Sequence, residues 1–285
     1  MEISLREGRI QDARECGRIL HSAFAAIAGA HNFPPDFPDA ATAAGIVRVT
    51  LGHPGFFSVV AERAGRIVGS NFLDERNTIS AVGPVTVDPD AQNSSIGARL
   101  MQAAIERSAS KGFAGIRLLQ AGYHCRSLAL YFKLGFNARE HICCLQGTAL
   151  NEQVAGYAVR PATDTDFAAC NALCEQVHGA ARAGELRDAL SHRVASVVER
   201  GGRITGYTTA IAFIGHAVCE TTDDLKALIS AAKSFDGPGF LAPSRNGELM
   251  RWCLSKGLRI TQTMTLMTMG LYNEPTGAYL ASVGY

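Results

Sequence analysis

The stretch VTVDPDAQNSSIGARL, residues 85–100, decides the fold because it joins a strand pattern to a helix pattern through a short polar turn. Val85 and Val87 alternate with their neighbours as in a half-buried strand. Apolar residues then recur at helical spacing, at Leu100, Met101, Ala104 and Ile105. The first N–H groups of a helix lack intrahelical partners, and the helix dipole adds positive charge there. The turn therefore predicts a cradle for phosphate groups.

Three kinds of phosphate-binding turn compete for this stretch. A Walker A loop ends in Gly-Lys-Ser/Thr, and the turn contains no lysine. A dinucleotide-binding loop needs three glycines, and only Gly97 is present. Gln92, Ser95 and Gly97 follow Val-Asp-Pro at residues 87–89, an arrangement that resembles the pyrophosphate loop of the GNAT acetyltransferases. Ser95 stands where that loop usually has its first glycine, which implies strain if the position needs a positive φ.

A second motif lies downstream, in HCRSLALYFKLGF at residues 124–136. It resembles the GNAT helix Asn-x-x-Ala-x-x-x-Tyr-x-x-x-Gly-Phe: Tyr131, Gly135 and Phe136 match, whereas His124 and Ser127 replace the usual Asn and Ala. Taken alone, Tyr131 could equally be a core aromatic of an amphipathic helix. Because both motifs occur in order, residues 1–150 are identified as a GNAT domain.

The apolar periodicity and the turn signals of residues 1–150 fit that assignment. They predict strands at 1–6, 56–63, 66–76, 78–89, 115–122 and 137–146, and helices at 10–28, 39–50, 97–111 and 126–134. The strand at 78–89 contains Gly83-Pro84, so a bulge or a splayed edge is expected there. The resemblance implies an α/β (α+β) fold, with a mixed, mostly antiparallel sheet flanked by helices in each domain.

The second half repeats this order of elements, which predicts a tandem of two domains, 1–150 and 151–285. A strand and a helix precede residue 179, and a hairpin turns at Gly201-Gly202 and continues as a strand through 208–215. The remaining predictions are helices at 221–234 and 247–256 and strands at 239–242 and 258–270. Asp223 and Asp224 stand where a phosphate cradle belongs and would repel pyrophosphate. The second half is therefore interpreted as a degenerate GNAT copy, and its last 21 residues, 265–285, resemble the C-terminal domain of the YitH-like tandem acetyltransferases.

Composition excludes several other classes. The chain has 285 residues, 47% of them hydrophobic, and a formal net charge of +1, so no global field attracts nucleic acid or an anionic membrane. The eight cysteines form no pattern typical of zinc ligands, so no metal site is expected. A charged N-terminus and the lack of any apolar run of ~20 residues argue against a signal peptide and a membrane span. A cytoplasmic location is expected, and the oligomeric state is not indicated.

The resemblance implies a donor and a site for it. Acetyl-CoA, or another acyl-CoA, would lie in a V-shaped gap between the strands at 78–89 and 115–122. Backbone groups of Val85, Thr86 and Val87 would meet the pantetheine arm, and the Val87 N–H would polarise the thioester carbonyl. The other residues expected to contact the cofactor are Gln92, Asn93, Ser94, Ser95, Ile96, Gly97, Ala98, Ser127 and Tyr131. An acceptor amine would attack directly, and Tyr131 would protonate the departing thiolate.

The general base and the acceptor are less defined. Asp74 and Glu75 at a strand end, and His124 at a helix start, are candidate bases, with His31 a weaker one. Carboxylates at strand ends are often only surface groups. A small-molecule amine is the expected acceptor. The alternative is a catalytically weak acyl-CoA-binding module with a sensing or scaffolding role, which Ser95 suggests.

Overall fold

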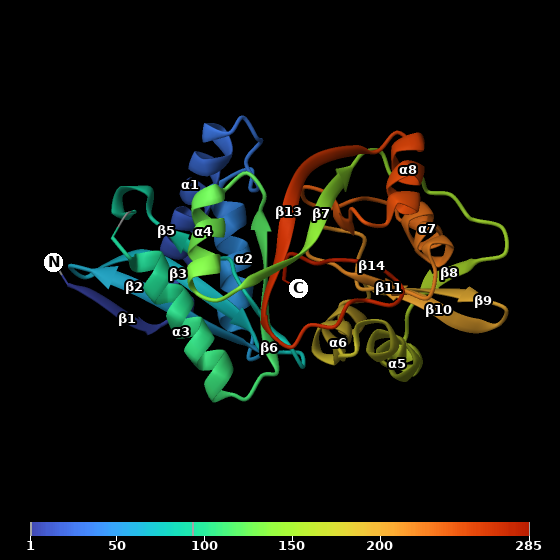
Figure 1. The fold of residues 1–285 in the computed structure, drawn as a ribbon, viewed down its shortest axis with the longest axis horizontal. Coiled ribbons are helices and arrows are strands. Elements are labelled where there is room, and N and C mark those ends of the chain that lie inside the picture. Colours follow the sequence, from blue (N-terminus) through green and yellow to red (C-terminus); the bar gives the residue numbers. More distant parts are fainter. Residues whose placement is uncertain (1, 93, 285) are drawn as a thin grey trace.

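A computed structural model of the chain describes residues 2–92 and 94–284. The first half lies on the left of Figure 1 and the second on the right. In the first half the elements are β1 (Ile3–Glu7), η1 (Ile10–Asp12), α1 (Ala13–Ala30), α2 (Ala40–Gly52), β2 (Phe56–Arg63), β3 (Arg66–Asp74), β4 (Ser80–Val82), β5 (Thr86–Val87), η2 (Pro89–Ala91), α3 (Ile96–Ser110), β6 (Gly115–Ala121), α4 (Cys125–Lys133) and β7 (Asn137–Gln146).

The second half repeats this order and adds one strand. Its elements are β8 (Ala158–Pro161), η3 (Asp164–Asp166), α5 (Phe167–His178), α6 (Ala183–Ser191), β9 (Ser196–Arg200), β10 (Arg203–Thr208), β11 (Ala217–Cys219), α7 (Thr222–Ala231), β12 (Phe240–Pro243), α8 (Gly247–Ser255), β13 (Arg259–Gly270) and β14 (Ala278–Leu280). Each element from β8 to β13 therefore has a counterpart in the first half, and β14 has none.

Most predicted elements are confirmed, with shifts of one to three residues at their ends. The expected interruption at Gly83-Pro84 divides the predicted strand into β4 and β5. The predicted strand at 208–215 is wrong, because β10 ends at Thr208 and an irregular segment leads to β11. Among the α-helices and strands, three were not predicted: α6, β11 and β14.

The first-half sheet is covered by helices on both faces, and neighbouring residues of β3 show which helices cover which face. Phe72 packs in a cluster with residues of α1 and α2, whereas Leu73 packs with Met101 and Ala104 of α3. Successive side chains of a strand point to opposite faces. The pair α1 and α2 therefore covers one face, and α3 covers the other together with α4, whose Tyr131 lies in the same cluster as Leu73.

The two halves exchange strands in the larger sheet. Within the described residues this sheet has nine strands, in the order β1-β2-β3-β4-β6-β13-β7-β12, with β5 paired to β3 off this path. Strand β13 of the second half lies between β6 and β7 of the first, and is antiparallel to both. Strand β7 in turn lies between β13 and β12. In Figure 1, β7 and β13 run side by side at the centre of the molecule.

This exchange makes the halves interdependent. In the first half, β6 and β7 lie one strand apart, and β13 of the second half fills the space between them. In the second half, β12 and β13 also lie one strand apart, and β7 of the first half fills that space. The long edges of β6 and β7 both pair with β13, so removing the second half would expose these two edges. One continuous sheet thus contains strands from both sides of residue 150. The division of the chain into two separate domains stays a prediction.

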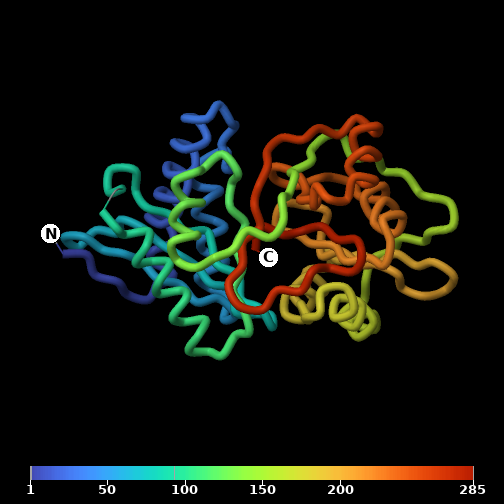
Figure 2. Tube along the Cα trace, viewed as in Figure 1, coloured from blue at the N-terminus to red at the C-terminus, as the bar shows by residue number. Residues whose placement is uncertain are grey.

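The additional strand, β14, occupies the gap of the second half that corresponds to the predicted acyl-CoA gap of the first. It pairs antiparallel with β11, Ala217 opposite Leu280, and the N–H of Ala281 donates to the carbonyl of Leu241 in β12 at 2.8 Å. Strands β11 and β12 therefore both contact β14. Figure 2 shows the chain ending near the centre of the molecule after this strand.

A polar contact also fixes the two halves together. The guanidinium of Arg76 joins Asp74 of β3, at 2.6 Å, to Asp188 of α6, at 2.7 Å. The side-chain oxygen of Asn77 accepts from the backbone N–H of Gly184 at 3.1 Å, at the start of α6. Among the described residues, every helix is too short or too polar to span a membrane.

Candidate functional site

The sheet of the first half opens at the ends of β4 and β6. These strands pair in parallel only at Ser80–Ile116 and Ala81–Arg117. The chain then leaves β6 and pairs with β3 instead, with Thr86 opposite Ser70 and Val87 opposite Gly69, while β6 continues to Ala121. The carboxyl end of β6 thus diverges from β5, where the sequence predicted a V-shaped gap.

The Val87 N–H points away from β3, on the side that the prediction requires. The N–H of Asp88 donates to the carbonyl of Val68 at 2.9 Å, so Asp88 and Val68 form a hydrogen-bonded pair. Hydrogen-bonded and non-bonded pairs alternate in an antiparallel ladder. Val87 therefore directs its N–H and its carbonyl outward, and that carbonyl accepts from Gln92 Nε2 at 3.4 Å. The outward N–H is available to a ligand carbonyl.

The start of α3, where the phosphate cradle was predicted, has no side-chain cap on its backbone donors. Ser95 is the N-cap, and its side chain makes no capping hydrogen bond to the helix. Its hydroxyl contacts the carbonyl of Ser94 at 2.6 Å, and the Ser94 hydroxyl donates to the carbonyl of Ala91. The first N–H groups of the helix, at Ile96, Gly97 and Ala98, are thus left for an anion. Asn93, which was predicted to contact the cofactor, lies outside the described residues.

The backbone at Ser95 is strained. Its φ is +60° and its ψ is 4°, in the left-handed region that glycine adopts without penalty. The sequence predicts strain at Ser95 if the position needs a positive φ, and the positive φ is present.

Ser95→Gly is therefore expected to raise the free energy of unfolding by about 1 kcal/mol, since glycine relieves the left-handed backbone. Acetyl-CoA affinity should stay equal or increase. Denaturant unfolding and calorimetric titration measure the two effects. Substantially weaker acetyl-CoA binding would mean instead that the Ser95 hydroxyl contacts the cofactor.

Arg126, in the first turn of α4, lies beside the predicted cradle and is not among the residues predicted for it. Its guanidinium donates to the side-chain oxygen of Gln92, the first residue of the pyrophosphate motif. A guanidinium here places positive charge next to the predicted phosphates. The sequence does place this arginine two residues after His124, the start of the tyrosine motif. The motif itself specifies no residue type at that position, so Arg126 was not singled out.

Tyr131 lies on α4 with its ring in the core. It is 7% exposed and packs edge-on against Phe136, with ring centroids 6.1 Å apart. Burial raises the pKa of the Tyr131 phenol above its ordinary value of 10.0, so the hydroxyl stays protonated at neutral pH, as an acid must. Within the described part of the chain, that hydroxyl forms no hydrogen bond with another side chain. Packing and acid chemistry are both compatible with this placement.

His124 lies at the N-cap of α4, where β6 ends. Its Nε2 is buried and has no hydrogen-bond partner among the described residues, and the same holds for Oε1 of the neighbouring Gln120. Burial, together with the charges of Arg126 and His31, lowers the pKa of His124 to about 4, so its imidazole is neutral at pH 7. The Ser127 hydroxyl, predicted to contact the cofactor, donates to the carbonyl of His124 at 2.9 Å.

Asp74 and Glu75 are not brought to this site. Asp74 is 4% exposed, lies opposite Ala81 where β4 and β6 are still paired, and is held by Arg76. Glu75 accepts two hydrogen bonds from Arg107, at 2.6 and 3.0 Å. Asp74 is four residues beyond Ser70 on β3, or roughly 13 Å at the rise of a strand. The structure gives both carboxylates arginine partners and separates them from the cradle.

In the second half, the region that corresponds to the cradle is closed. The α7 N-terminus has a capping box, in which Asp224 accepts from the Thr221 N–H at 3.1 Å. Asp224 is fully buried and also accepts from Thr205 at 2.6 Å and from Arg200 at 3.2 Å. The pKa of Asp224 is lowered by these three partners, although burial opposes them. The Thr221 hydroxyl accepts from the Asp224 N–H, so the capping box takes two backbone donors at this helix start, and the buried carboxylate adds a charge that disfavours an anion. Asp223 instead lies 60% exposed beside Lys226.

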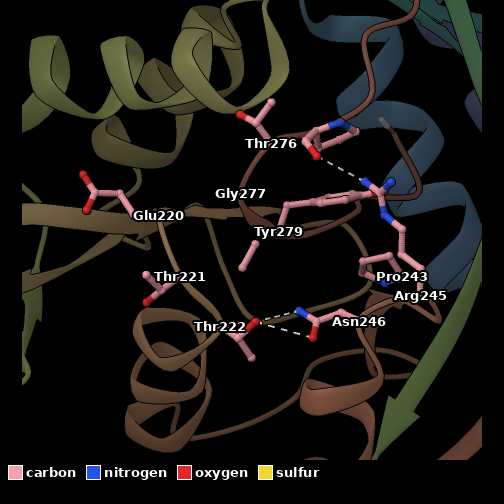
Figure 3. A pocket seen from close by; sticks show the side chains of 11 residues that line it. Glu220, Thr221, Thr222, Pro243, Arg245, Asn246, Thr276, Gly277 and Tyr279 are labelled. Atoms are coloured by element: carbon pink, nitrogen blue, oxygen red, sulfur yellow. Dashed lines mark hydrogen bonds between the residues drawn. The ribbon is translucent and has the colours of Figure 1, made fainter.

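A pocket of about 400 Å³ remains between the starts of α7 and α8 and the segment that leads into β14 (Figure 3). Figure 3 shows Thr222 and Asn246 hydrogen-bonded to each other across it. Arg245 is engaged with Glu140 at 2.9 Å, and Glu220 adds negative charge to the wall. The polar side chains that line the pocket thus bond to one another. At the spacing of the tyrosine motif, Cys253 of α8 stands where α4 has Tyr131.

Comparisons with known proteins agree with this geometry. A family model described as the acetyltransferase (GNAT) domain matches residues 54–138, which include β2 to α4. A search of curated proteins finds no match.

Similar solved structures extend over nearly the whole chain. A proposed acetyltransferase from Pyrococcus horikoshii has a TM-score of 0.76 at 14% identity, covering 99% of this chain and 95% of that one. A GCN5-related N-acetyltransferase from Sphaerobacter thermophilus has a TM-score of 0.61 at 15% identity, with 95% and 96% covered. A tandem GNAT protein from the clavulanic acid biosynthesis pathway has a TM-score of 0.55 at 14% identity, with 94% and 98% covered. Residues 54–138 therefore match the GNAT acetyltransferase domain, and the chain over nearly its whole length has the fold of these structures, a tandem GNAT protein among them.

Proposed function

We propose that the protein transfers an acetyl group from acetyl-CoA to the amine of a small molecule, and that its first half alone binds the donor. The observation that supports this most is the uncapped start of α3 beside the divergence of β5 from β6. Residues 92–98 would hold the pyrophosphate on backbone N–H groups, with Arg126 adjacent. The pantetheine arm would run along Val85, Thr86 and Val87 toward the end of β6.

The reaction proceeds by direct attack. The acceptor nitrogen bonds to the thioester carbon while the carbonyl oxygen accepts a hydrogen bond from the Val87 N–H. The carbon–sulfur bond then breaks, and the departing thiolate takes the proton of the Tyr131 hydroxyl. The acceptor nitrogen gives up a proton to a base or to water. That proton then passes to the Tyr131 phenolate and restores the phenol.

His124 is the base candidate that the geometry favours. Of Asp74, Glu75 and His124, only His124 lies at the end of β6. Its buried Nε2 has no hydrogen-bond partner within residues 2–92 and 94–284. Its lowered pKa keeps the imidazole neutral, and thus able to accept a proton, above pH 4. Asp74 and Glu75 act better as structural partners of Arg76 and Arg107.

The alternative function is acyl-CoA binding without efficient transfer. The strained Ser95 supports it, because strain in the cradle costs affinity or stability. Seven of the eight cysteines are buried free thiols, which agrees with the proposed cytoplasmic location for either function.

One experiment separates the two functions. Thiol release from acetyl-CoA is followed across a panel of small amines, beside calorimetric binding of acetyl-CoA to the same sample. Transfer predicts thiol release that depends on the amine and saturates with it. Tight acetyl-CoA binding with no amine-dependent release would favour the binding module, and the absence of binding would contradict both.

A further inference from the structure

Gln120, the second-last residue of β6, has a buried side chain whose hydrogen-bonding groups are only partly satisfied within the described chain. The residue is 3% exposed, and its Nε2 donates to the carbonyl of His124 at 2.9 Å and contacts the Ser127 hydroxyl at 3.4 Å. A backbone carbonyl can only accept, so the first contact fixes which end of the amide is the nitrogen. The other end, Oε1, is buried and forms no hydrogen bond within residues 2–92 and 94–284.

The place of Gln120 in the sheet is beside the proposed acyl-CoA gap. Strand β4 pairs with β6 only as far as Arg117, and Gln120 lies three residues further along β6, or roughly 10 Å at the rise of a strand. At its other edge β6 pairs with β13, where Gln120 lies opposite Thr265. Gln120 therefore belongs to the part of β6 whose edge toward β5 pairs with no strand of the described chain.

The side chain of Gln120 lies on the face of the sheet that carries the proposed donor site. Leu118, two residues earlier on the same strand, packs in one cluster with Met101 of α3 and Tyr131 of α4. Side chains two residues apart on a strand share a face, and the contact with the first turn of α4 agrees with this. The start of α3, where the pyrophosphate is proposed to bind, is on this face too. Of the two reactants, the acyl donor is therefore the one whose path passes Gln120.

The pantetheine arm of the donor supplies the kind of group that this oxygen can bind. The arm contains two amides, each with one N–H and one carbonyl. An amide that enters a buried gap loses its hydrogen bonds to water, and an unpaired N–H there is costly. Groups of the arm that face β5 can pair with outward backbone groups such as the Val87 N–H. Groups that face β6 need a partner on that side, and Oε1 of Gln120 is an acceptor there.

We propose that Oε1 of Gln120 accepts a hydrogen bond from one pantetheine amide N–H, which makes Gln120 a positioning residue for the acyl donor. This inference rests on the proposed function and adds a residue to its donor site. The oxygen is out of contact with solvent, so the arm displaces a neighbouring side chain to reach it. The Nε2 of the same amide holds the carbonyl of His124. One side chain thus links the donor arm to the start of the helix that carries Tyr131.

The test pairs a change in the protein with a change in the ligand. Calorimetry measures the affinity of acetyl-CoA and of two analogues, each with an ester oxygen in place of one pantetheine amide N–H. For the wild-type protein, one analogue should bind about tenfold more weakly than acetyl-CoA, as expected for one hydrogen bond. Gln120→Met keeps a similar volume and removes the amide, so it should bind acetyl-CoA and that analogue about equally. A merely structural role of Gln120 would weaken both ligands alike and preserve the difference.

Gln102→Met is the matched control, because Gln102 is exposed on α3 and bonds only to Glu106 among the described side chains. It should keep the tenfold difference. If Gln120→Met does not fold, NMR of the wild-type protein with ¹³C-labelled glutamine side-chain carbonyls replaces it. One resonance should then shift with acetyl-CoA and not with the weaker analogue.

Three results would overturn the inference. They are equal affinities of all three ligands for the wild-type protein, the same difference in wild type and Gln120→Met, and no amide-dependent glutamine resonance. Absence of acetyl-CoA binding would contradict both this inference and the proposed function. Failure of the proposed function alone is recognised separately, as absence of amine-dependent thiol release while the difference between acetyl-CoA and the analogue is intact.

Discussion

Replacing Tyr131 with Phe is expected to lower kcat by about 100-fold or more and to leave acetyl-CoA affinity unchanged. The ring packs against Phe136 in the core, and phenylalanine keeps this contact. Only the hydroxyl is removed, and within the described residues no side chain depends on it for a hydrogen bond. Protonation of the thiolate is needed in the transition state but not for binding, so the loss should appear in kcat rather than in affinity.

The measurement is steady-state thiol release with a saturating amine, beside calorimetric titration of acetyl-CoA. Tyr207→Phe is the matched control: that hydroxyl bonds to Nε2 of the buried His216 at 2.9 Å in the second half. Its loss should lower the free energy of unfolding by about 1–3 kcal/mol, because the imidazole loses its partner, with near-normal turnover at a temperature where the protein is folded. Equal kcat for wild type and Tyr131→Phe would remove Tyr131 from the mechanism.

Gly97→Glu is expected to abolish acetyl-CoA binding. A Cβ at Gly97 would lie 3.7 Å from both Leu130 and Val87, at ordinary contact distance, so a longer side chain has to extend into the cradle. Its carboxylate would compete with pyrophosphate for the free N–H groups of α3 and would repel it. Affinity should fall by at least about 100-fold, as expected when one charge-assisted site becomes repulsive.

Two variants control for folding and charge in this titration. Gly97→Ala should bind nearly as well as wild type, because its Cβ meets only ordinary contacts. Gly45→Glu adds the same charge to α2 at a position with open space around it and should not change affinity. Normal affinity in a folded Gly97→Glu variant would show that the cradle is not the pyrophosphate site.

The sequence predicts the local structure of the first half well because each signal there is local. Asp39 caps α2 as expected, accepting from the Thr42 N–H at 2.7 Å, and Gly83-Pro84 interrupts its strand. The two motifs, 27 or more residues apart, meet in space, where Arg126 contacts Gln92. Residues at a turn or a cap report their backbone conformation directly, so the turn that leads into α3 could be located from sequence.

The strand exchange could not be predicted, because it depends on which edges remain free after each half forms. The sequence of β13 shows a strand, but nothing in it specifies β6 and β7 as neighbours rather than β12. For the same reason β14 was missed: its few residues carry no strong pattern, and its place is defined by the gap between β11 and β12. Nonlocal pairing of this kind is determined by packing.

The candidate bases show a similar limit. The sequence placed Asp74 and Glu75 at a strand end, which is correct, but could not show that Arg76 and Arg107 hold them. The partner of Arg76 beyond Asp74 is Asp188, 112 residues away in the second half.

The number of acetyl-CoA molecules bound per chain tests the central claim most directly. A capping box of Thr221 and Asp224 closes the start of α7, and β14 fills the second gap. The start of α3 has no side-chain cap, and the first gap holds no strand of the described chain. Calorimetric titration of the wild-type protein should therefore give one acetyl-CoA per chain. Two per chain would contradict the closed second half, and none would contradict the cradle in the first.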